Sequence, residues 1–170
     1  MSTADSPTSA DRALSGTREW VSAAGYLFVL APSLLLAASA WSDSSPALAF
    51  IGLILVAPLL RAFFGDVGDE APEWSEAVSN ALAQLPILAG LAYLTAVASL
   101  ATAIAVKGWN GQDLLWLGAG LWTTSSLATC IGHELLHDRN RPLALFVGKL
   151  VMGVAGYPLQ EQEHIIHHRR

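Results

Sequence analysis

Hydrophobic residues fill four stretches of the chain that contain no Lys, Arg, Asp or Glu. These stretches are residues 20–42, 44–60, 77–106 and 114–133, and they are 23, 17, 30 and 20 residues long. A helix needs about 20 mostly apolar residues to cross the roughly 30 Å hydrocarbon core of a bilayer. The pattern therefore predicts an all-α integral membrane protein, a multi-span helical bundle with four transmembrane helices.

The first predicted span is bordered by tryptophans. It covers residues 21–40 between Trp20 and Trp41, and aromatic residues at both ends are typical of the membrane interface. Residues 1–19 are rich in Ser, Thr and Ala. We therefore expect a flexible N-terminal tail over 1–19, followed by one transmembrane domain over 20–170.

The other predicted spans follow after short connections. They cover residues 47–64, a span within 80–106, and 114–131. Because 80–106 is longer than one crossing requires, this span either tilts or begins near Pro86. A fifth apolar stretch, residues 143–159, is interrupted by Lys149. Because this stretch is short and carries a charge, we expect a short or re-entrant helix there.

Composition narrows the class of protein further. Apolar residues make up 53% of the chain and charged residues 14%, against about 25% charged in ordinary soluble domains. These values exclude intrinsic disorder and a basic nucleic-acid-binding module, and the single cysteine, Cys130, excludes a disulfide scaffold. Five acidic residues at positions 66–76 account for much of the net charge of −5, and we interpret them as a solvated loop.

The positions of the basic residues predict how the chain is oriented in the membrane. If the four spans alternate in direction, Lys107 falls on one side of the membrane and all seven arginines on the other: Arg12, Arg18, Arg61, Arg139, Arg141, Arg169 and Arg170. Loops rich in Lys and Arg stay in the cytoplasm. We therefore expect the N-terminus and the segment after the fourth span on the cytoplasmic side of an inner or plasma membrane.

All five histidines lie in the last 38 residues, in two groups. The first group is Gly-His133-Glu-Leu-Leu-His137, and the second is Glu-His164-Ile-Ile-His167-His168. On a helix, residues three or four positions apart share one face, with Cβ atoms about 5–6 Å apart. Imidazole is a good ligand for Fe, Zn, Cu and Ni. Each group is therefore predicted to bind metal.

The first group also matches the HExxH pattern of zinc metallopeptidases. In that pattern the two histidines bind zinc and Glu134 is the general base; Glu161 or Glu163 would be the third ligand. A catalytic zinc takes three protein ligands, whereas five histidines in two groups fit a site with more than one metal. An intramembrane zinc metallopeptidase stays the alternative interpretation.

The two histidine groups, the 26 residues between them and the preceding apolar spans resemble the membrane-bound fatty acid desaturase superfamily. The run Gly-His-Glu-Leu-Leu-His-Asp-Arg-Asn-Arg-Pro and the acidic loop before the third span are similar to its alkane monooxygenase and xylene monooxygenase branch. The resemblance covers roughly residues 50–170. In the second group two residues, Ile165 and Ile166, precede the histidine pair. This spacing is usual in desaturases, so hydroxylase and desaturase both stay open.

The resemblance implies a non-haem di-iron enzyme of lipid metabolism that uses O2 to attack C–H bonds of an alkyl or fatty-acyl chain, with hydroxylation favoured over desaturation. It implies a rubredoxin, ferredoxin or cytochrome as the electron donor. It also implies a third HxxHH group farther downstream, so we expect residues 1–170 to be the N-terminal portion of such an enzyme, inactive alone. The implied ligands of the two iron ions within this chain are His133, His137, His164, His167 and His168.

Carboxylates beside these histidines are candidates for orienting them. Histidines that bind metal usually donate their other N–H to a carboxylate or a carbonyl, and Glu134, Asp138 and Glu163 are close enough in sequence to accept it. For Asp138, a surface ion pair with Arg139 or Arg141 is the alternative.

Two tryptophans and two glycines in the fourth span are candidates for helix packing or for lining a substrate tunnel. Trp116 and Trp122 are candidates to line a substrate tunnel, although lipid contact or packing is the more common role of such residues. Gly118 and Gly120 are predicted to allow close helix packing.

Overall fold

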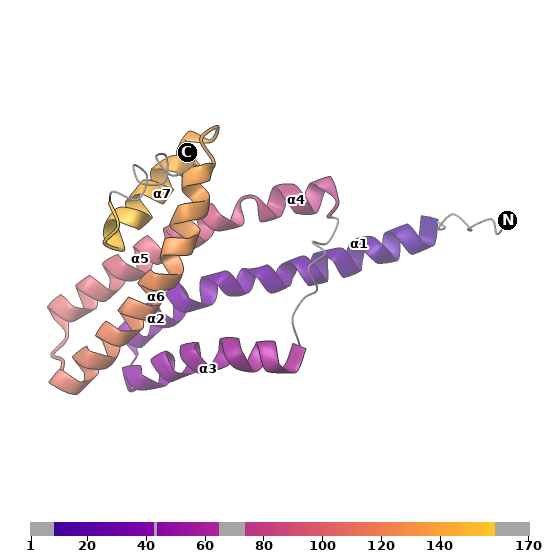
Figure 1. Cartoon of the computed structure of the whole chain (residues 1–170). Coiled ribbons are helices and arrows are strands. Elements are labelled where there is room, and N and C mark those ends of the chain that lie inside the picture. Colours follow the sequence, from indigo (N-terminus) through magenta and orange to yellow (C-terminus); the bar gives the residue numbers. More distant parts are fainter. Residues whose placement is uncertain (1–8, 43, 65–73, 159–170) are drawn as a thin grey trace.

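The computed structural model describes residues 9–42, 44–64 and 74–158, and these residues form helices joined by short connections. Within them no strand occurs, so the all-α prediction is confirmed. Figure 1 shows the helices in chain order: α1 (Ser9–Ala24), the 3₁₀ segment η1 (Gly25–Leu30), α2 (Ala31–Trp41), α3 (Pro46–Phe64), α4 (Glu76–Leu82), α5 (Leu85–Val106), α6 (Gly111–His137) and α7 (Pro142–Val154).

Three helical runs in the described residues are long and apolar enough to cross a membrane: Gly16–Trp41, Glu76–Val106 and Gly111–His137. They contain the first, third and fourth predicted spans. The second predicted span corresponds to α3, of which Pro46–Leu55 is a shorter apolar helix, and the fifth stretch corresponds to the short helix α7. Large apolar side chains point outward on these helices, with Leu115 76% and Trp122 73% exposed. Such surfaces are compatible with contact to lipid.

The N-terminal region differs from its prediction. Residues 9–19, expected in a flexible tail, belong to helix α1. This segment contains Ala, Leu, Arg and Glu, which have high helix propensity, and helix formation continues into the apolar run that follows. Glu19 also accepts a hydrogen bond from the backbone N–H of Ser75, which ties α1 to the start of α4.

Local signals explain where α6 and α7 begin and end. Asn110 caps α6, because its side chain accepts a hydrogen bond from the Asp113 N–H at 2.8 Å. Pro142 opens α7. At the end of α7, the N–H of Tyr157 bonds to Met152 O and that of Gly156 to Gly153 O, the Schellman pattern. This pattern needs a left-handed residue, and Gly156 supplies it with φ of 95°.

The buried core has two parts. The α5–α6–α7 cluster contains Ile87, Tyr93, Ala128, Leu135, Ala144, Val147 and Val151. The α2–α5–α6 cluster contains Leu36, Ala40, Ala96, Leu100, Ala103 and Leu117. Helices α5 and α6 contribute to both, so they form the centre on which α2 and α7 pack.

Glycines permit the closest helix contacts, although at positions other than those predicted. A Cβ on Gly90 would lie 2.7 Å from Val147 Cγ1, and one on Gly148 would lie 2.8 Å from Leu135 Cβ. Gly118, by contrast, has nothing within 4 Å, and a Cβ on Gly120 would make an ordinary 3.5 Å contact with Leu36. The prediction for Gly118 is therefore wrong, because this residue faces outward.

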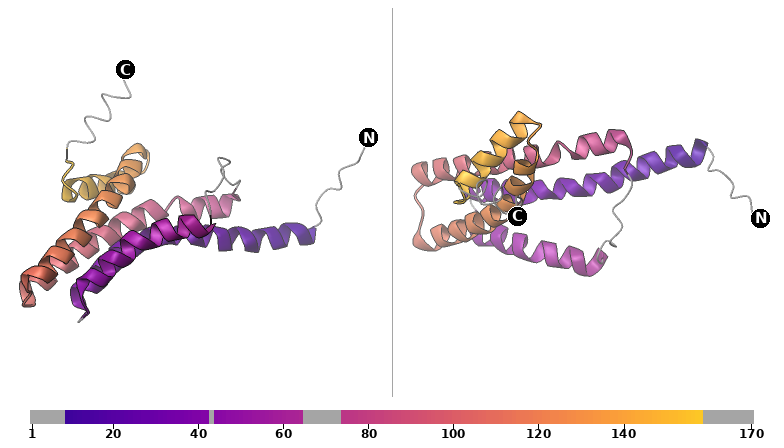
Figure 2. Two further views of the ribbon diagram at one scale, coloured as in Figure 1. Left: turned by 60° about the horizontal axis from the view of Figure 1, so that its bottom comes forward. Right: turned by 45° about the horizontal axis from the view of Figure 1, so that its top comes forward.

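The connections at one end of the bundle are held together by Lys107. Its Nζ donates to Ala40 O at 3.4 Å and to Ser42 O at 3.3 Å, so the α5–α6 connection lies beside the end of α2. Figure 2 shows the α2–α3 and α5–α6 connections at this same end. Such a placement is what consecutive helices of alternating direction produce.

Candidate metal centre

The first histidine group lies on the last two turns of α6, which extends beyond the predicted end of the fourth span to His137. His133 Nε2 and His137 Nε2 are 3.1 Å apart, and the two ring centroids are 4.8 Å apart with the planes at 70°. The rings share a hydrogen bond whose donor depends on the tautomers. The helix therefore places the two Nε2 atoms next to each other.

This separation fits a shared metal ion. Metal–imidazole nitrogen bonds are about 2.0–2.1 Å long, so one ion can bind two nitrogens up to about 4.2 Å apart. Within the described residues, however, no group of three or more His, Cys, Asp or Glu side chains is placed to hold an ion. The pair can thus supply two ligands. The other predicted ligands, His164, His167 and His168, and the candidate Glu163 lie outside the described residues.

A close contact between α6 and α7 places the histidine pair. Gly132, directly before His133, packs against α7, where a Cβ on it would lie 2.6 Å from Met152 Sδ and 3.1 Å from Val151 Cγ1. One turn of helix α6 further, buried Leu135 packs against Gly148 of α7. Sequence reasoning missed Gly132; its place immediately before a candidate ligand was the available signal.

A hollow of about 480 Å³ lies beside His133. It is lined by Thr129, Cys130, His133, Glu134, Met152 and Tyr157, which come from the last turns of α6, from α7 and from the residues directly after α7. Glu134 is exposed, and its carboxylate borders this hollow together with the imidazole of His133. The hollow is large enough for a small molecule and contains groups that can exchange a proton.

A second hollow, of about 360 Å³, is apolar and borders the same part of α6. Its walls include Tyr26 and Val29 of η1, Trp74, Leu85 of α5 and Ile131 of α6. The Tyr26 and Trp74 rings meet edge to face with centroids 6.0 Å apart. Cys130 and Glu134 line both hollows. An apolar chain in the second hollow would therefore lie next to the first hollow and its histidine.

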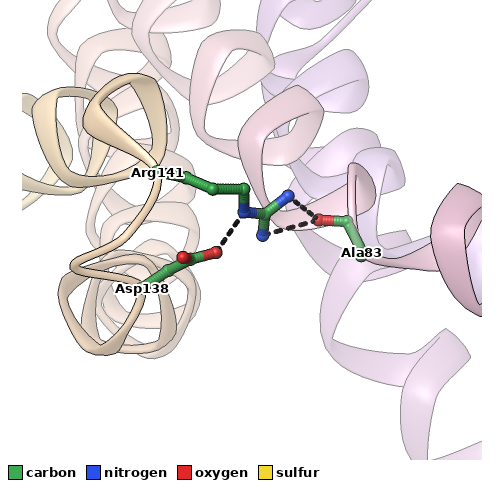
Figure 3. A network of polar contacts seen from close by, with 3 residues as sticks. All are labelled: Ala83, Asp138 and Arg141. Carbon is green, nitrogen blue, oxygen red and sulfur yellow. Dashed lines mark hydrogen bonds and ion pairs between the residues drawn. The ribbon is translucent and has the colours of Figure 1, made fainter.

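The other site candidates lie as follows. Asp138 Oδ2 accepts a hydrogen bond from Arg141 Nε, which is the ion pair named as its alternative role (Figure 3). Trp116 packs on Phe50 of α3 with ring centroids 5.4 Å apart and lines a crevice of about 10 Å³, too small for a substrate. Trp122 points outward. Both tryptophans thus have packing or surface positions.

No protein-family model, curated protein or solved structure matches the chain.

Proposed function

We propose that this chain belongs to a membrane-bound non-haem di-iron oxygenase that acts on C–H bonds of an alkyl or fatty-acyl chain, with hydroxylation favoured over desaturation. One observation carries the proposal: His133 Nε2 and His137 Nε2 converge to 3.1 Å at the end of a helix of membrane length. Ionisable residues in a membrane-spanning helix are rare and often mark a functional site.

The proposed ligand set extends beyond this pair. His133 and His137 would hold one iron, and the resemblance of the second histidine group assigns His164, His167 and His168 to the same centre. Two iron ions held by these residues would supply the activation of O2. Glu134 borders the hollow beside His133, where its carboxylate can accept or return a proton.

The membrane arrangement supports an apolar substrate. We assign α3 as the second membrane span in chain order, which brings the number of spans to four, and α7 as a short or re-entrant helix, with the histidines on the cytoplasmic side. A soluble rubredoxin, ferredoxin or cytochrome can then approach the metal from the cytoplasm. The 360 Å³ apolar hollow, which borders Glu134, would hold the alkyl chain.

A zinc metallopeptidase is the second candidate, and one observation favours it. Glu134 stands on the same helix between the paired histidines and borders the hollow that contains His133, as the general base of an HExxH site does. The two proposals differ in the metal and in the role of the second histidine group.

Metal analysis of the full-length protein in detergent tests both. We expect two irons per chain, and we expect the combined variant His133→Ala/His137→Ala to lose them, whereas Ser126→Ala, two turns earlier on α6, keeps them. One zinc per chain that persists in Glu134→Gln, with loss of proteolysis, would support the peptidase instead. Absence of bound metal in the unsubstituted protein would overturn both.

A further inference from the structure

A three-way polar contact lies directly after the histidine pair. Arg141 Nε donates to Asp138 Oδ2, while Arg141 Nη1 and Nη2 both donate to Ala83 O at 3.1 Å (Figure 3). Asp138 is the C-cap of α6, Arg141 is the N-cap of α7, and Ala83 is the C-cap of α4. One guanidinium therefore joins three helix ends, two of them 58 residues apart in sequence.

The chemistry of these ends suits an arginine. The last carbonyls of a helix have no partner within the helix and carry partial negative charge, so a cation beside the Ala83 carbonyl is favourable. A guanidinium is planar and presents five N–H donors in a fixed arrangement, so it can bind a carboxylate on one edge and a carbonyl on another. A lysine ammonium cannot reproduce this geometry.

The contact has little importance for overall stability. The Arg141 and Asp138 side chains are 37% and 26% exposed, and exposed ion pairs contribute little because water and salt screen them. The contact matters instead for the position of the helix ends that it joins. His137 is the last residue of α6, and terminal turns of helices fray unless they are tied down. Asp138, the next residue, is tied through Arg141 to the α4–α5 junction.

The same junction forms a wall of the apolar hollow. Leu82 and Leu85, on either side of Ala83, both line it. We propose that Arg141 is a positioning residue, which holds the imidazole of His137 in register with His133 and holds that pair in place against the wall of the apolar hollow. This inference rests on the proposed metal site at the two histidines.

Cobalt(II) binding tests this role, because the visible absorption of the ion reports both its affinity and its ligand geometry. In full-length protein in detergent, we expect Arg141→Gln, Arg141→Lys and Asp138→Asn to weaken Co²⁺ binding by about 10-fold and to alter the spectrum. This is the lower end of the loss of about 10- to 100-fold seen when groups that orient metal ligands are removed. Arg139→Gln, at an exposed neighbouring residue, is the matched control and should bind as the unsubstituted protein does.

Arg141→Lys separates positioning from charge. If the arginine served stability through its charge alone, the lysine variant would recover both affinity and spectrum, and that outcome would overturn the proposal. Thermal unfolding of each variant, expected to match the unsubstituted protein, shows that the fold is retained. If the unsubstituted protein binds Co²⁺ and His133→Ala/His137→Ala does not, while all Arg141 variants bind normally, the positioning role fails and the metal site stands. If the unsubstituted protein binds no Co²⁺ at the histidines, the metal site fails and the positioning role with it.

Discussion

The two core clusters of the bundle are packed in different ways. In the α5–α6–α7 cluster, Gly90, Gly132 and Gly148 each bring a neighbouring helix so close that a Cβ would overlap it, at 2.6–2.8 Å. In the α2–α5–α6 cluster, the space between helices is filled by Leu36, Leu100 and Leu117, and Gly120 makes an ordinary contact. The closely packed cluster is the one that carries the histidine pair. Within membranes helices associate through such close van der Waals contact, so the candidate site lies on the more closely packed part of the bundle.

The largest expected effect comes from filling the contact whose neighbouring atoms are least able to move. Gly148→Ala places a methyl 2.8 Å from Leu135 Cβ and 3.2 Å from the backbone oxygen of Gly132, neither of which is the end of a flexible side chain. We expect a loss of about 1–3 kcal/mol in the free energy of unfolding, measured by denaturant titration in detergent. Gly120→Ala, in the other cluster, should change it by less than about 0.5 kcal/mol. Equal losses would mean that the clusters do not differ.

The two clusters also differ in a polar contact, for which we expect the second-largest effect. The hydroxyl of Tyr93, a residue only 1% exposed, and that of Ser125 are hydrogen-bonded at 2.9 Å in the α5–α6–α7 cluster. Tyr93→Phe should cost about 0.6–1.5 kcal/mol in unfolding free energy, the range for hydrogen bonds between helices in membranes. The coupling energy from a double-mutant cycle with Ser125→Ala measures this bond directly. A coupling of zero would contradict the assignment.

The hydroxyl of Thr124, beside the α2–α5–α6 cluster, contrasts with that of Tyr93. Its Oγ1 is buried without a hydrogen-bond partner in the part of the chain that the structure describes. Thr124→Val keeps the shape and removes the unpaired hydroxyl, so we expect a gain of about 0.5 kcal/mol in unfolding free energy. Thr123→Val is the matched control, because the Thr123 hydroxyl donates to Ala119 O at 3.0 Å, and it should bring no gain. A loss for Thr124→Val would show that the hydroxyl is paired.

The smallest effect is expected at the end of the bundle far from the histidines. Lys107 Nζ bonds to carbonyls at the end of α2 and lies 4.8 Å from the centroid of the Trp109 ring. Lys107→Met should lower the unfolding free energy by about 0.3–0.5 kcal/mol, because a partly buried cation beside helix-end carbonyls contributes a few tenths of a kcal/mol. It should also leave Co²⁺ binding unchanged, whereas Arg141, the cation at the other end, should affect binding and not stability. A change in the Co²⁺ affinity of Lys107→Met would contradict the expected difference between the two ends of the bundle.

Much of the fold could be predicted because its signals are local. Absence of charge marked the long helices, Pro86 marked the start of α5, and HxxxH spacing placed His133 beside His137. Which side of each helix packs against its neighbours could not be predicted. Helix α5 is apolar on all sides, and a helix of this kind has no polar face to reveal which residues meet a neighbour. Gly90 of α5 therefore gave no sequence signal, although it packs against Val147 and Val151 of α7. On α6, Gly118 faces outward whereas Gly132 packs against Met152.

The candidate site was predictable in part for the same reason. Spacing along one helix predicts that His133 and His137 lie together as candidate ligands, but the contact from Arg141 to Ala83 joins residues 58 positions apart. The 3₁₀ segment over Gly25–Leu30, which forms part of the wall of the apolar hollow, also gave no sequence signal, because its residues are compatible with an ordinary α-helix. Such features depend on how distant segments are brought together.

The single thiol of the chain provides a built-in reporter of the site. Cys130 is exposed and stands where the two hollows meet, one turn of α6 before His133. Because the chain contains one cysteine, a maleimide fluorophore or a nitroxide attaches at a single place without any substitution. A nitroxide there would be broadened by a paramagnetic ion at the histidines, and a fluorophore would respond to an alkyl chain that enters the apolar hollow. Occupancy of the proposed metal site and of the apolar hollow could thus be followed separately with residues 1–170 unchanged.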